Sequence, residues 1–214
     1  TMKNSMRNTV AKSLSVAVLC LSASAMASPV TFDVTPGGFT PGPGYGPGLT
    51  DLGVSFATTV TPQSFSLSTG GSQSFQFGTV RLQDEGLANL LPVGAFINPF
   101  EQGGLGVSAT FNFFNPLSGS QTVTATGNAI LGFIADPAID FTIDWNDVVV
   151  NFGNGGQFTI SMNDLNFTAN NQSRTQNATI TLNSSPVPEP ATMALLGIAL
   201  AGLGVTTRKQ KKAA

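Results

Sequence analysis

Apolar and polar residues alternate with a period of two along most of the middle of the chain. In segments 107–113, 158–162 and 178–182, every second residue is apolar, and the residues between them are Ser, Thr or Asn. This alternation is typical of strands with one buried face and one polar face. Similar runs recur from Leu52 to residue 183, so we expect an all-β domain of eight to ten short strands, folded as an antiparallel β-sandwich.

Two of these runs make specific side-chain predictions. Val54, Phe56 and Val60 are expected to point inward from one strand. In segment 139–145, Ile139, Phe141, Ile143 and Trp145 are expected to face the core, and Asp140, Thr142 and Asp144 the solvent. Trp145 is therefore predicted to be a core residue.

Glycine and proline divide the strands. Gly70-Gly71 lies between two alternating runs and predicts a hairpin, and residues 153–156, Gly-Asn-Gly-Gly, predict a second turn. Segment 36–48 has four prolines and six glycines and predicts a loop or linker. Tyr45 in this loop is expected to be exposed, and is the better candidate for stacking on a sugar. The sequence is also compatible with a short helix at residues 84–91.

The N-terminal residues have the composition of an export signal. Lys3, Arg7 and Lys12 precede the apolar run LSVAVLCL at 14–21, and Ala25-Met26-Ala27 follows it. This order is that of a secretory signal peptide, and the run is too short to span a membrane. We expect a signal peptide at residues 1–27, removed by signal peptidase between Ala27 and Ser28.

Cleavage there would leave a mature chain without cysteine or histidine, since the one Cys is Cys20 and there is no His. Disulfides, Cys/His metal sites and Cys- or His-based catalysis are then excluded. Residues 28–185 contain two basic and ten acidic residues, a net charge of −8. Such a body repels phosphate backbones, so no nucleic-acid partner is expected.

The C-terminal residues combine three features in a fixed order. Val187-Pro188-Glu189-Pro190 is followed by seventeen uncharged, mostly apolar residues at 191–207 and then by a basic cluster, Arg208, Lys209, Lys211 and Lys212. As a helix the apolar run would rise about 25 Å, at the short limit for a membrane span. The basic cluster would remain in the cytoplasm and leave the body outside. We expect a single transmembrane helix here.

These three features resemble the PEP-CTERM sorting signal of exopolysaccharide-producing Gram-negative bacteria. The resemblance implies that an exosortase, a membrane-embedded protease-like enzyme, recognises Pro188, Glu189 and Pro190 and cuts near them. Two prolines would keep this segment extended and accessible to a protease. The body resembles the all-β choice-of-anchor domains found upstream of such tails. The expected organisation is a signal peptide at 1–27, a β-sandwich at 28–183 and a sorting signal at 184–214.

The acidic residues raise two further site hypotheses. Asp140, Asp144 and Asp147 are candidate calcium ligands, but Asp140 and Asp144 would lie about 13 Å apart on one strand and could not share an ion. We therefore expect a solvated sheet face and no metal or cofactor. A pair of carboxylates could also serve glycoside hydrolysis, although nothing marks a catalytic pair.

Four N-x-S/T sequons begin at Asn166, Asn171, Asn177 and Asn183. In a bacterium these sequons favour a polar stalk and strand face, and they leave glycosylation open.

The leading functional hypothesis is a non-catalytic, exported protein of the cell surface or extracellular matrix. Its expected partners are the exosortase, signal peptidase, the membrane before processing, and exopolysaccharide. The alternatives are a glycan- or calcium-dependent binding module and, third, a glycan hydrolase.

Overall fold

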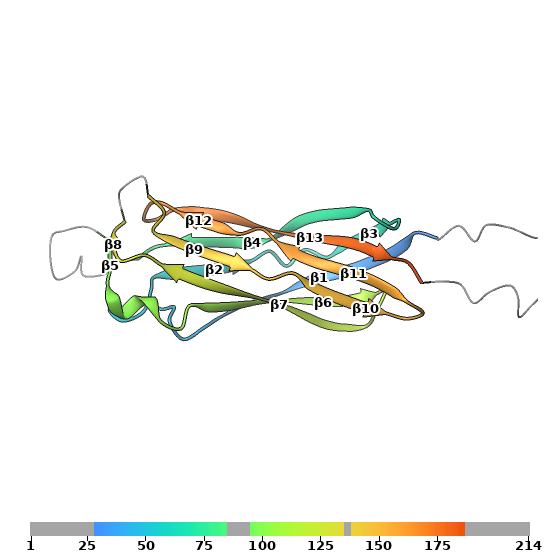
Figure 1. The fold of residues 1–214 in the computed structure, drawn as a ribbon, viewed down its shortest axis with the longest axis horizontal. Helices are drawn as coiled ribbons and strands as arrows, with labels where there is room; N and C mark the ends of the chain where they lie inside the picture. Colours follow the sequence, from blue (N-terminus) through green and yellow to red (C-terminus); the bar gives the residue numbers. More distant parts are fainter. Residues whose placement is uncertain (1–27, 85–94, 135–137, 187–214) are drawn as a thin grey trace, which may run out of the picture.

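The computed structural model describes residues 28–84, 95–134 and 138–186. These residues form two antiparallel sheets, packed face to face in an elongated body (Figure 1). The first sheet has the order β12 (Leu165–Phe167), β9 (Phe141–Trp145), β7 (Gly119–Ala129), β6 (Gly106–Asn115), β1 (Val30–Pro41) and β3 (Gln63–Leu67). The second sheet has the order β10 (Val148–Phe152), β11 (Gly156–Met162), β13 (Ser173–Ser184), β4 (Ser72–Leu82) and β2 (Val54–Thr58). The prediction of an antiparallel β-sandwich is confirmed.

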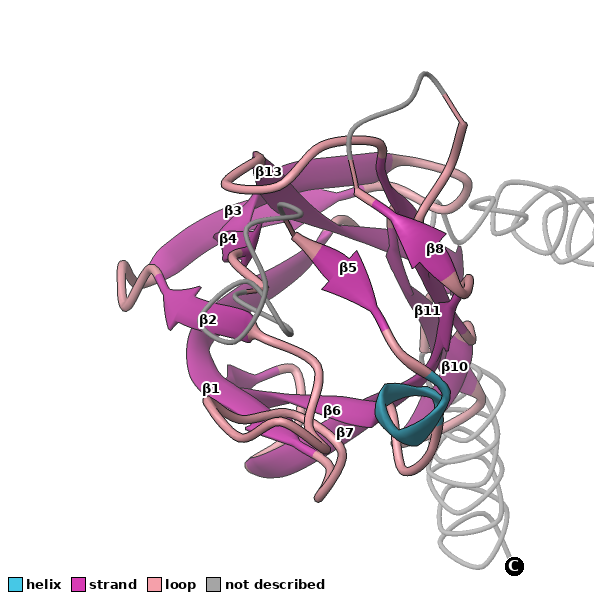
Figure 2. Cartoon of the chain, turned by 90° about the vertical axis from the view of Figure 1, so that its left-hand side faces the viewer, coloured by secondary structure: helices cyan, strands magenta, loops and turns pink. Residues whose placement is uncertain are grey.

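Phenylalanine rings fill the space between the sheets, and both sheets curve around this interior (Figure 2). Phe32 on β1 meets Phe158 on β11 edge to face, with ring centroids 5.2 Å apart. Phe77 on β4 lies 4.7 Å from Phe111 on β6. All four side chains are fully buried. Each pair joins one sheet to the other, so aromatic burial holds the two layers together.

The alternating runs lie where the pattern predicts. The apolar residues of the alternating runs 107–113 on β6, 158–162 on β11 and 178–182 on β13 are buried, and Trp145 is 9% exposed. The turn at residues 153–156 joins β10 to β11 as a hairpin, with Asn154 and Gly155 at positive φ.

The predicted hairpin at Gly70-Gly71 is wrong. β3 pairs with β1 in the first sheet, and β4 pairs with β2 and β13 in the second. Residues 68–71 therefore carry the chain from one sheet to the other. The Gly70 N–H donates to the Leu182 carbonyl at 2.7 Å, and the Leu182 N–H donates to Gly71 at 3.0 Å. The glycines supply a turn, with Gly70 at a φ of 82°, but the partner of each flanking strand comes from elsewhere in the chain.

The prediction of a loop over residues 36–48 is wrong in its first half. β1 continues to Pro41 and pairs with β6 along this stretch, with an irregularity between Pro36 and Gly38. Beyond Val34 the ladder with β3 ends, so this part of β1 has one hydrogen-bonded neighbour, β6. A strand paired on one side tolerates a proline, which has no N–H to donate, and glycine at a φ of 135° accommodates the irregularity.

Two residues that were predicted to face the core, Val60 and Ile139, are exposed instead. Val60 is 68% exposed because β2 ends at Thr58. Ile139 is 41% exposed and Asp140 only 6%, the reverse of the predicted faces. β9 begins at Phe141, so these two residues precede the regular alternation.

One end of the body is closed by short elements. β5 (Phe96–Ile97) pairs with β8 (Gly132–Phe133), and the 3₁₀ turn η2 (Pro99–Gln102) follows β5. We call this the far end (Figure 1). The helix left open at residues 84–91 falls, apart from Asp84, outside the described residues, as do the signal peptide and the expected transmembrane helix. Within the described part of the chain, no helix is long and apolar enough to cross a membrane.

Candidate functional site

Both ends of the described chain lie at the same end of the body, opposite the far end, which we call the tail end (Figure 1). Val30 on β1 pairs with Leu67, and the turn that follows Leu67 binds the end of β13. The hydroxyls of Thr69 and Ser185 lie 3.1 Å apart, within hydrogen-bond distance. The folded body thus holds the chain firmly up to the residues that immediately precede the sorting motif.

Most of the expected sorting residues lie outside the described part of the chain. These are Ala25, Ala27, Val187, Pro188, Glu189, Pro190, Arg208, Lys209, Lys211 and Lys212. Ser28 is described and exposed, two residues before β1 begins. Ser184 is the last residue of β13, where its hydroxyl donates to the Gly155 carbonyl at 2.8 Å. The sorting motif therefore begins three residues after the last strand.

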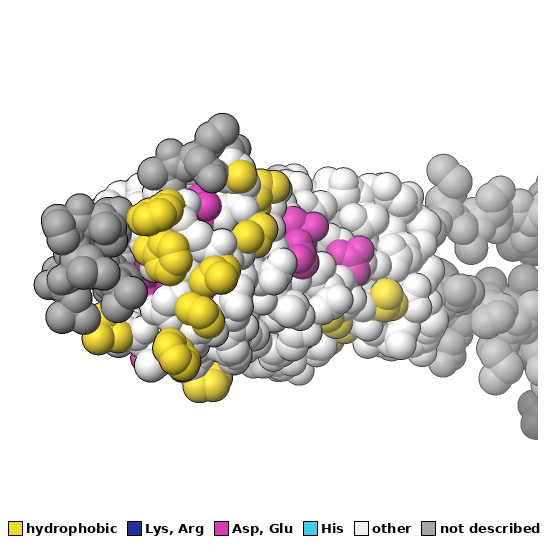
Figure 3. Space-filling view, turned by 60° about the vertical axis from the view of Figure 1, so that its left-hand side comes forward, with side chains coloured by type: hydrophobic (Ala, Val, Ile, Leu, Met, Phe, Trp, Pro, Cys, Tyr) yellow, Lys and Arg dark blue, Asp and Glu magenta, His cyan; other side chains and the backbone are white. Residues whose placement is uncertain are grey.

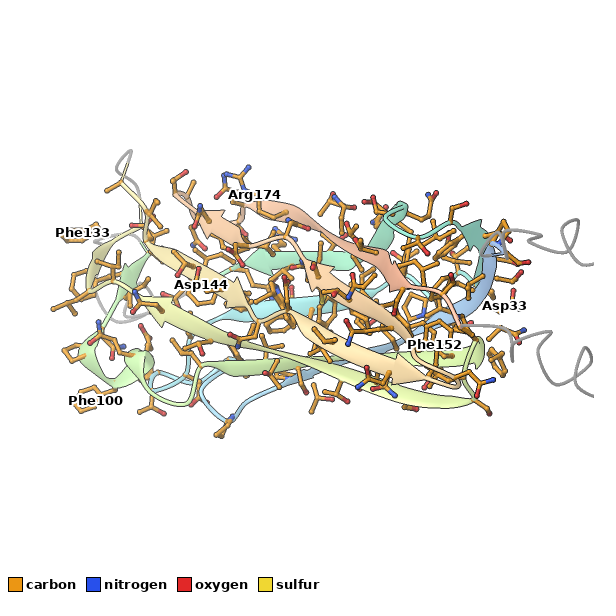
Figure 4. All side chains as sticks on the ribbon, turned by 45° about the vertical axis from the view of Figure 1, so that its right-hand side comes forward. Asp33, Phe100, Phe133, Asp144, Phe152 and Arg174 are labelled. Carbon is orange, nitrogen blue, oxygen red and sulfur yellow. The ribbon has the colours of Figure 1, made fainter. Side chains whose placement is uncertain are left out.

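The candidate calcium ligands do not share a site. Asp140 is buried beside β12, where its N–H donates to the Phe167 carbonyl at 2.8 Å. Asp144 is exposed on β9 and accepts a 3.3 Å hydrogen bond from the Thr142 hydroxyl (Figure 4). Asp147 is exposed between β9 and β10. No group of three or more Asp, Glu, His or Cys side chains that could hold a metal ion occurs within residues 28–84, 95–134 and 138–186.

The sequons begin at exposed asparagines in the domain rather than in a separate stalk. Asn166 lies on β12, Asn171 lies in the turn before β13, and Asn177 and Asn183 lie on β13 itself. β13 is the central strand of the second sheet, between β11 and β4. The polar residues of this segment therefore form the outer face of a strand whose other face is core.

Tyr45, expected to be exposed, packs into the far end. Its ring meets Phe56 edge to face at 5.1 Å, and its hydroxyl donates a 2.6 Å hydrogen bond to the Leu105 carbonyl. Burial raises the pKa of this hydroxyl. Tyr45 therefore fastens the Gly/Pro loop to the start of β6 and is not an exposed platform for a sugar.

The far end contains a buried carboxyl that the sequence argument overlooked. Glu101, in η2, is fully buried, and its two oxygens accept hydrogen bonds from Asn98, one from the backbone N–H at 2.7 Å and one from the side-chain amide at 2.6 Å. The Asn98 side chain in turn caps Phe100 N–H at 2.8 Å and donates to the Leu49 carbonyl at 2.9 Å. This is a capping box, whose signal in the sequence is an Asn with Glu three residues later and Pro between them. A single turn has no periodicity to draw attention to it.

Burial raises the pKa of the Glu101 carboxyl to about 7. The Asn98 N–H opposes this rise, and the charges of Asp84 and Asp51 add to it. A perturbed carboxyl can mark a catalytic acid, but this one has no exposed surface and both its oxygens bind Asn98. Its geometry is that of a structural group that ties η2 to the Leu49 loop.

A polar pocket of about 420 Å³ opens beside this cluster. The pocket lies between the loop at residues 46–49, the start of β2 and the end of β4. Its polar side chains are Gln83, Asp84, Asn170 and Asn171. Asn171 accepts a 2.9 Å hydrogen bond from Arg81, and Asn170 donates to the Asp84 carbonyl at 2.6 Å. Its neutral amides suit hydroxyl-rich ligands, and its lining contains no aromatic ring for sugar stacking.

Comparison with known proteins adds one finding to this geometry. Neither the curated proteins nor the solved structures contain a match to the chain. The similarity of the body to choice-of-anchor domains therefore stays a prediction. The family model described as the PEP-CTERM protein-sorting motif matches residues 186–209, which begin two residues after β13 ends. Residues 186–209 of the chain thus form a PEP-CTERM protein-sorting motif, which is consistent with an extracellular protein that an exosortase sorts.

Proposed function

We propose that this chain is a non-catalytic protein of the cell surface or extracellular matrix, exported through a signal peptide, cut by an exosortase and associated with exopolysaccharide. The observation that carries the proposal is the position of the PEP-CTERM motif directly after β13. The motif implies a membrane-anchored precursor that is processed and exported to the cell surface.

The short spacing between fold and motif supports this order of events. From Ser184 to Pro188 the chain can span at most about 14 Å. β13 ends at Ser184, and the prolines that follow in the sequence, Pro186, Pro188 and Pro190, have no N–H to donate to a β-ladder. A membrane enzyme would therefore bind an accessible linear segment, and the folded body would lie close to the outer surface of the membrane.

The surface of the second sheet supports an association with polysaccharide. Its outer face has neutral hydroxyl and amide groups in contact across the strands. Ser74 and Thr179 hydroxyls lie 2.7 Å apart, and the Asn183 amide donates to the Thr159 hydroxyl at 2.8 Å. Such groups can exchange hydrogen bonds with glycan hydroxyls without the charge that would repel an acidic polymer.

Two observations support a non-catalytic body. The span 28–185 lacks His and Cys, and the perturbed carboxyl of Glu101 is enclosed by its own capping box. Hydrolysis of the exported polysaccharide by the purified protein, abolished by substituting one acidic residue, would contradict this part of the proposal.

The test of sorting compares the chain's mass and location in strains with and without the exosortase. The released, shortened form should appear only with the enzyme. The double variant Pro188→Ala/Glu189→Ala should be exported but remain uncut in the membrane, whereas the control Ser185→Ala should be processed normally. The same full-length, membrane-bound species in both strains would refute sorting. Retention of the released protein on polysaccharide from the same cells tests the association separately.

The polar pocket favours a second candidate function, a glycan-binding module. Gln83 is an exposed polar side chain of its lining, directly after β4 ends, so Gln83→Ala should weaken oligosaccharide binding, measured by calorimetry. Gln73→Ala, an exposed glutamine at the other end of β4, is the matched control. Equal binding by both variants would remove this candidate.

A further inference from the structure

Exposed apolar side chains gather at the far end. Of the nine large hydrophobic residues exposed in the described part of the chain, six lie on or beside its closing elements. Figure 3 shows hydrophobic side chains gathered over one face of that end. We call these six residues the far-end patch: Leu49, Phe100, Ile130, Leu131, Phe133 and Ile139. Phe100 is the most exposed of them, at 74%. Figure 4 places both Phe100 and Phe133 at this end, far from Asp33 at the tail end.

Hydrogen bonds fix the backbone beneath this patch. Phe133 pairs with Phe96 across β5 and β8, and their rings meet edge to face at 5.0 Å. The η2 turn is tied to the end of β7 by the Gln102 amide, which donates to the Ala129 carbonyl at 2.9 Å. Ile130 N–H donates to Asp140 at 2.8 Å. The patch is therefore a preformed surface, which lowers the entropy lost when a partner binds.

The chemistry of the patch fits a protein better than a glycan. It combines phenylalanine with branched aliphatic side chains, and the nearby Glu101 is fully buried. Aromatic and aliphatic anchors of this kind are typical of the centre of protein interfaces. Sugar platforms instead need flat rings with hydrogen-bonding groups beside them.

The size of the patch is near the lower limit for a symmetric dimer. Two phenylalanines and four aliphatic side chains at these exposures present on the order of 500 Å² of surface. Two such faces in contact would bury about 1,000 Å², near the lower limit for a specific interface. The commonest oligomer is a two-fold dimer in which the same patch is used by both copies.

We propose that the far-end patch is the contact surface of a dimer in which two copies of this chain meet far end to far end. The position of the chain ends supports this arrangement. Residues 28 and 186 lie at the tail end, so these two residues of each copy would lie away from the interface (Figure 1). The tails of both copies remain free for attachment.

Electrostatics predicts how the dimer responds to salt. Each body has a net charge of −8 over residues 28–185, so the copies repel each other at long range. Salt screens this repulsion and strengthens apolar contact. The dimer should therefore form at lower protein concentration in 0.5 M than in 0.05 M sodium chloride.

Sedimentation of the exported chain over a range of concentrations tests the proposal. The sample is the protein that the cells release. If the tail is retained, the sample is the full-length chain, embedded at one copy per lipid nanodisc. The outcome is therefore independent of exosortase processing. We expect a monomer–dimer equilibrium in the micromolar range. Phe100→Ser should raise the dissociation constant at least tenfold. The matched control is Phe114→Ser, because Phe114 is 68% exposed on β6, away from the patch, and this variant should dimerise as the unaltered chain does.

Three results would overturn the proposal. The chain could remain monomeric at several hundred micromolar in high salt, or Phe114→Ser could weaken association as much as Phe100→Ser does. The chain could also remain monomeric while Phe100→Ser abolishes its retention on exported polysaccharide or on phospholipid vesicles. That result would show that the patch binds the polysaccharide or the membrane instead of a second copy. Circular dichroism of each variant establishes that the loss of association occurs in folded protein.

Discussion

The indole N–H of Trp145 donates a 3.0 Å hydrogen bond to the side-chain oxygen of Gln176, and this bond joins the two sheets inside the core. Trp145 belongs to β9 and Gln176 to β13, and Gln176 has no exposed surface. The Gln176 amide donates onward to the Asn163 carbonyl at 2.8 Å. A buried polar pair of this kind favours one alignment of the sheets, because any shift would leave a polar group without a partner.

Replacing Gln176 by methionine should therefore destabilise the protein. Gln176→Met keeps most of the side-chain volume but leaves the Trp145 N–H without an acceptor, which should lower the free energy of unfolding by about 1–3 kcal/mol. Trp145 is the single tryptophan, so its fluorescence in a urea titration reports the transition. Gln73→Met, at an exposed position of β4, should change stability by less than about 0.5 kcal/mol. Equal stability of the two variants would show that the buried bond contributes nothing.

Glu101 should make stability depend on pH between about 4.5 and 7. Its pKa is raised from 4.5 to about 7 in the fold, so in this range the folded state holds a proton that the unfolded state has released. Its contribution to stability is thus fully present below pH 4.5 and is lost as the pH rises through 7. Glu101→Gln should flatten the decline of the unfolding free energy over this interval, measured by urea denaturation at several pH values.

Asp33 is the control for this experiment, because its shift has the opposite sign. Hydrogen bonds from Ser64 and Asn115 lower the pKa of its exposed carboxyl from 3.8. Any contribution it makes to stability is lost as the pH falls below 3.8, so Asp33→Asn should leave the slope between pH 4.5 and 7 unchanged. A slope that survives in Glu101→Gln would exclude Glu101 as its source.

Gly44 should tolerate no side chain. A Cβ at this position would collide with the carbonyl oxygen of Gly103, across the contact where Gly44 N–H donates to the Gly104 carbonyl at 3.1 Å. We expect Gly44→Ala to lower stability by about 1–3 kcal/mol, because one backbone must move away from the other. Gly103→Ala has open space around its Cβ and serves as the control in the same thermal melts. The prediction fails if the two alanine variants melt together.

The exported protein should begin at Ser28. Cleavage after Ala27 leaves two residues before β1, so it removes no residue of the fold, and Val30 keeps its pairing with Leu67. N-terminal sequencing of protein recovered from outside the cell gives the answer directly. Material that still begins near Met2 would contradict the signal-peptide prediction.

The period-two pattern by itself determined which side chains of β6, β11 and β13 are buried, because successive residues of any strand point to opposite faces. It also singled out Trp145 as core. The motif at Pro188, Glu189 and Pro190 could be read without any fold, since a sorting enzyme recognises a linear segment.

The sheet to which each strand belongs was decided only by the tertiary structure. The residues around Gly70-Gly71 suit a turn equally well within a sheet or between sheets, and the pairing of β3 with β1 joins residues 29 to 37 positions apart. Tyr45 was assigned to solvent because its neighbours are glycine and proline, yet the ring is covered by Phe56 and Phe141 from distant strands. The far-end patch likewise draws its members from five separate connections and short elements. Local alternation specifies a face, whereas burial, sheet membership and surface patches depend on contacts between segments that the chain brings together only by folding.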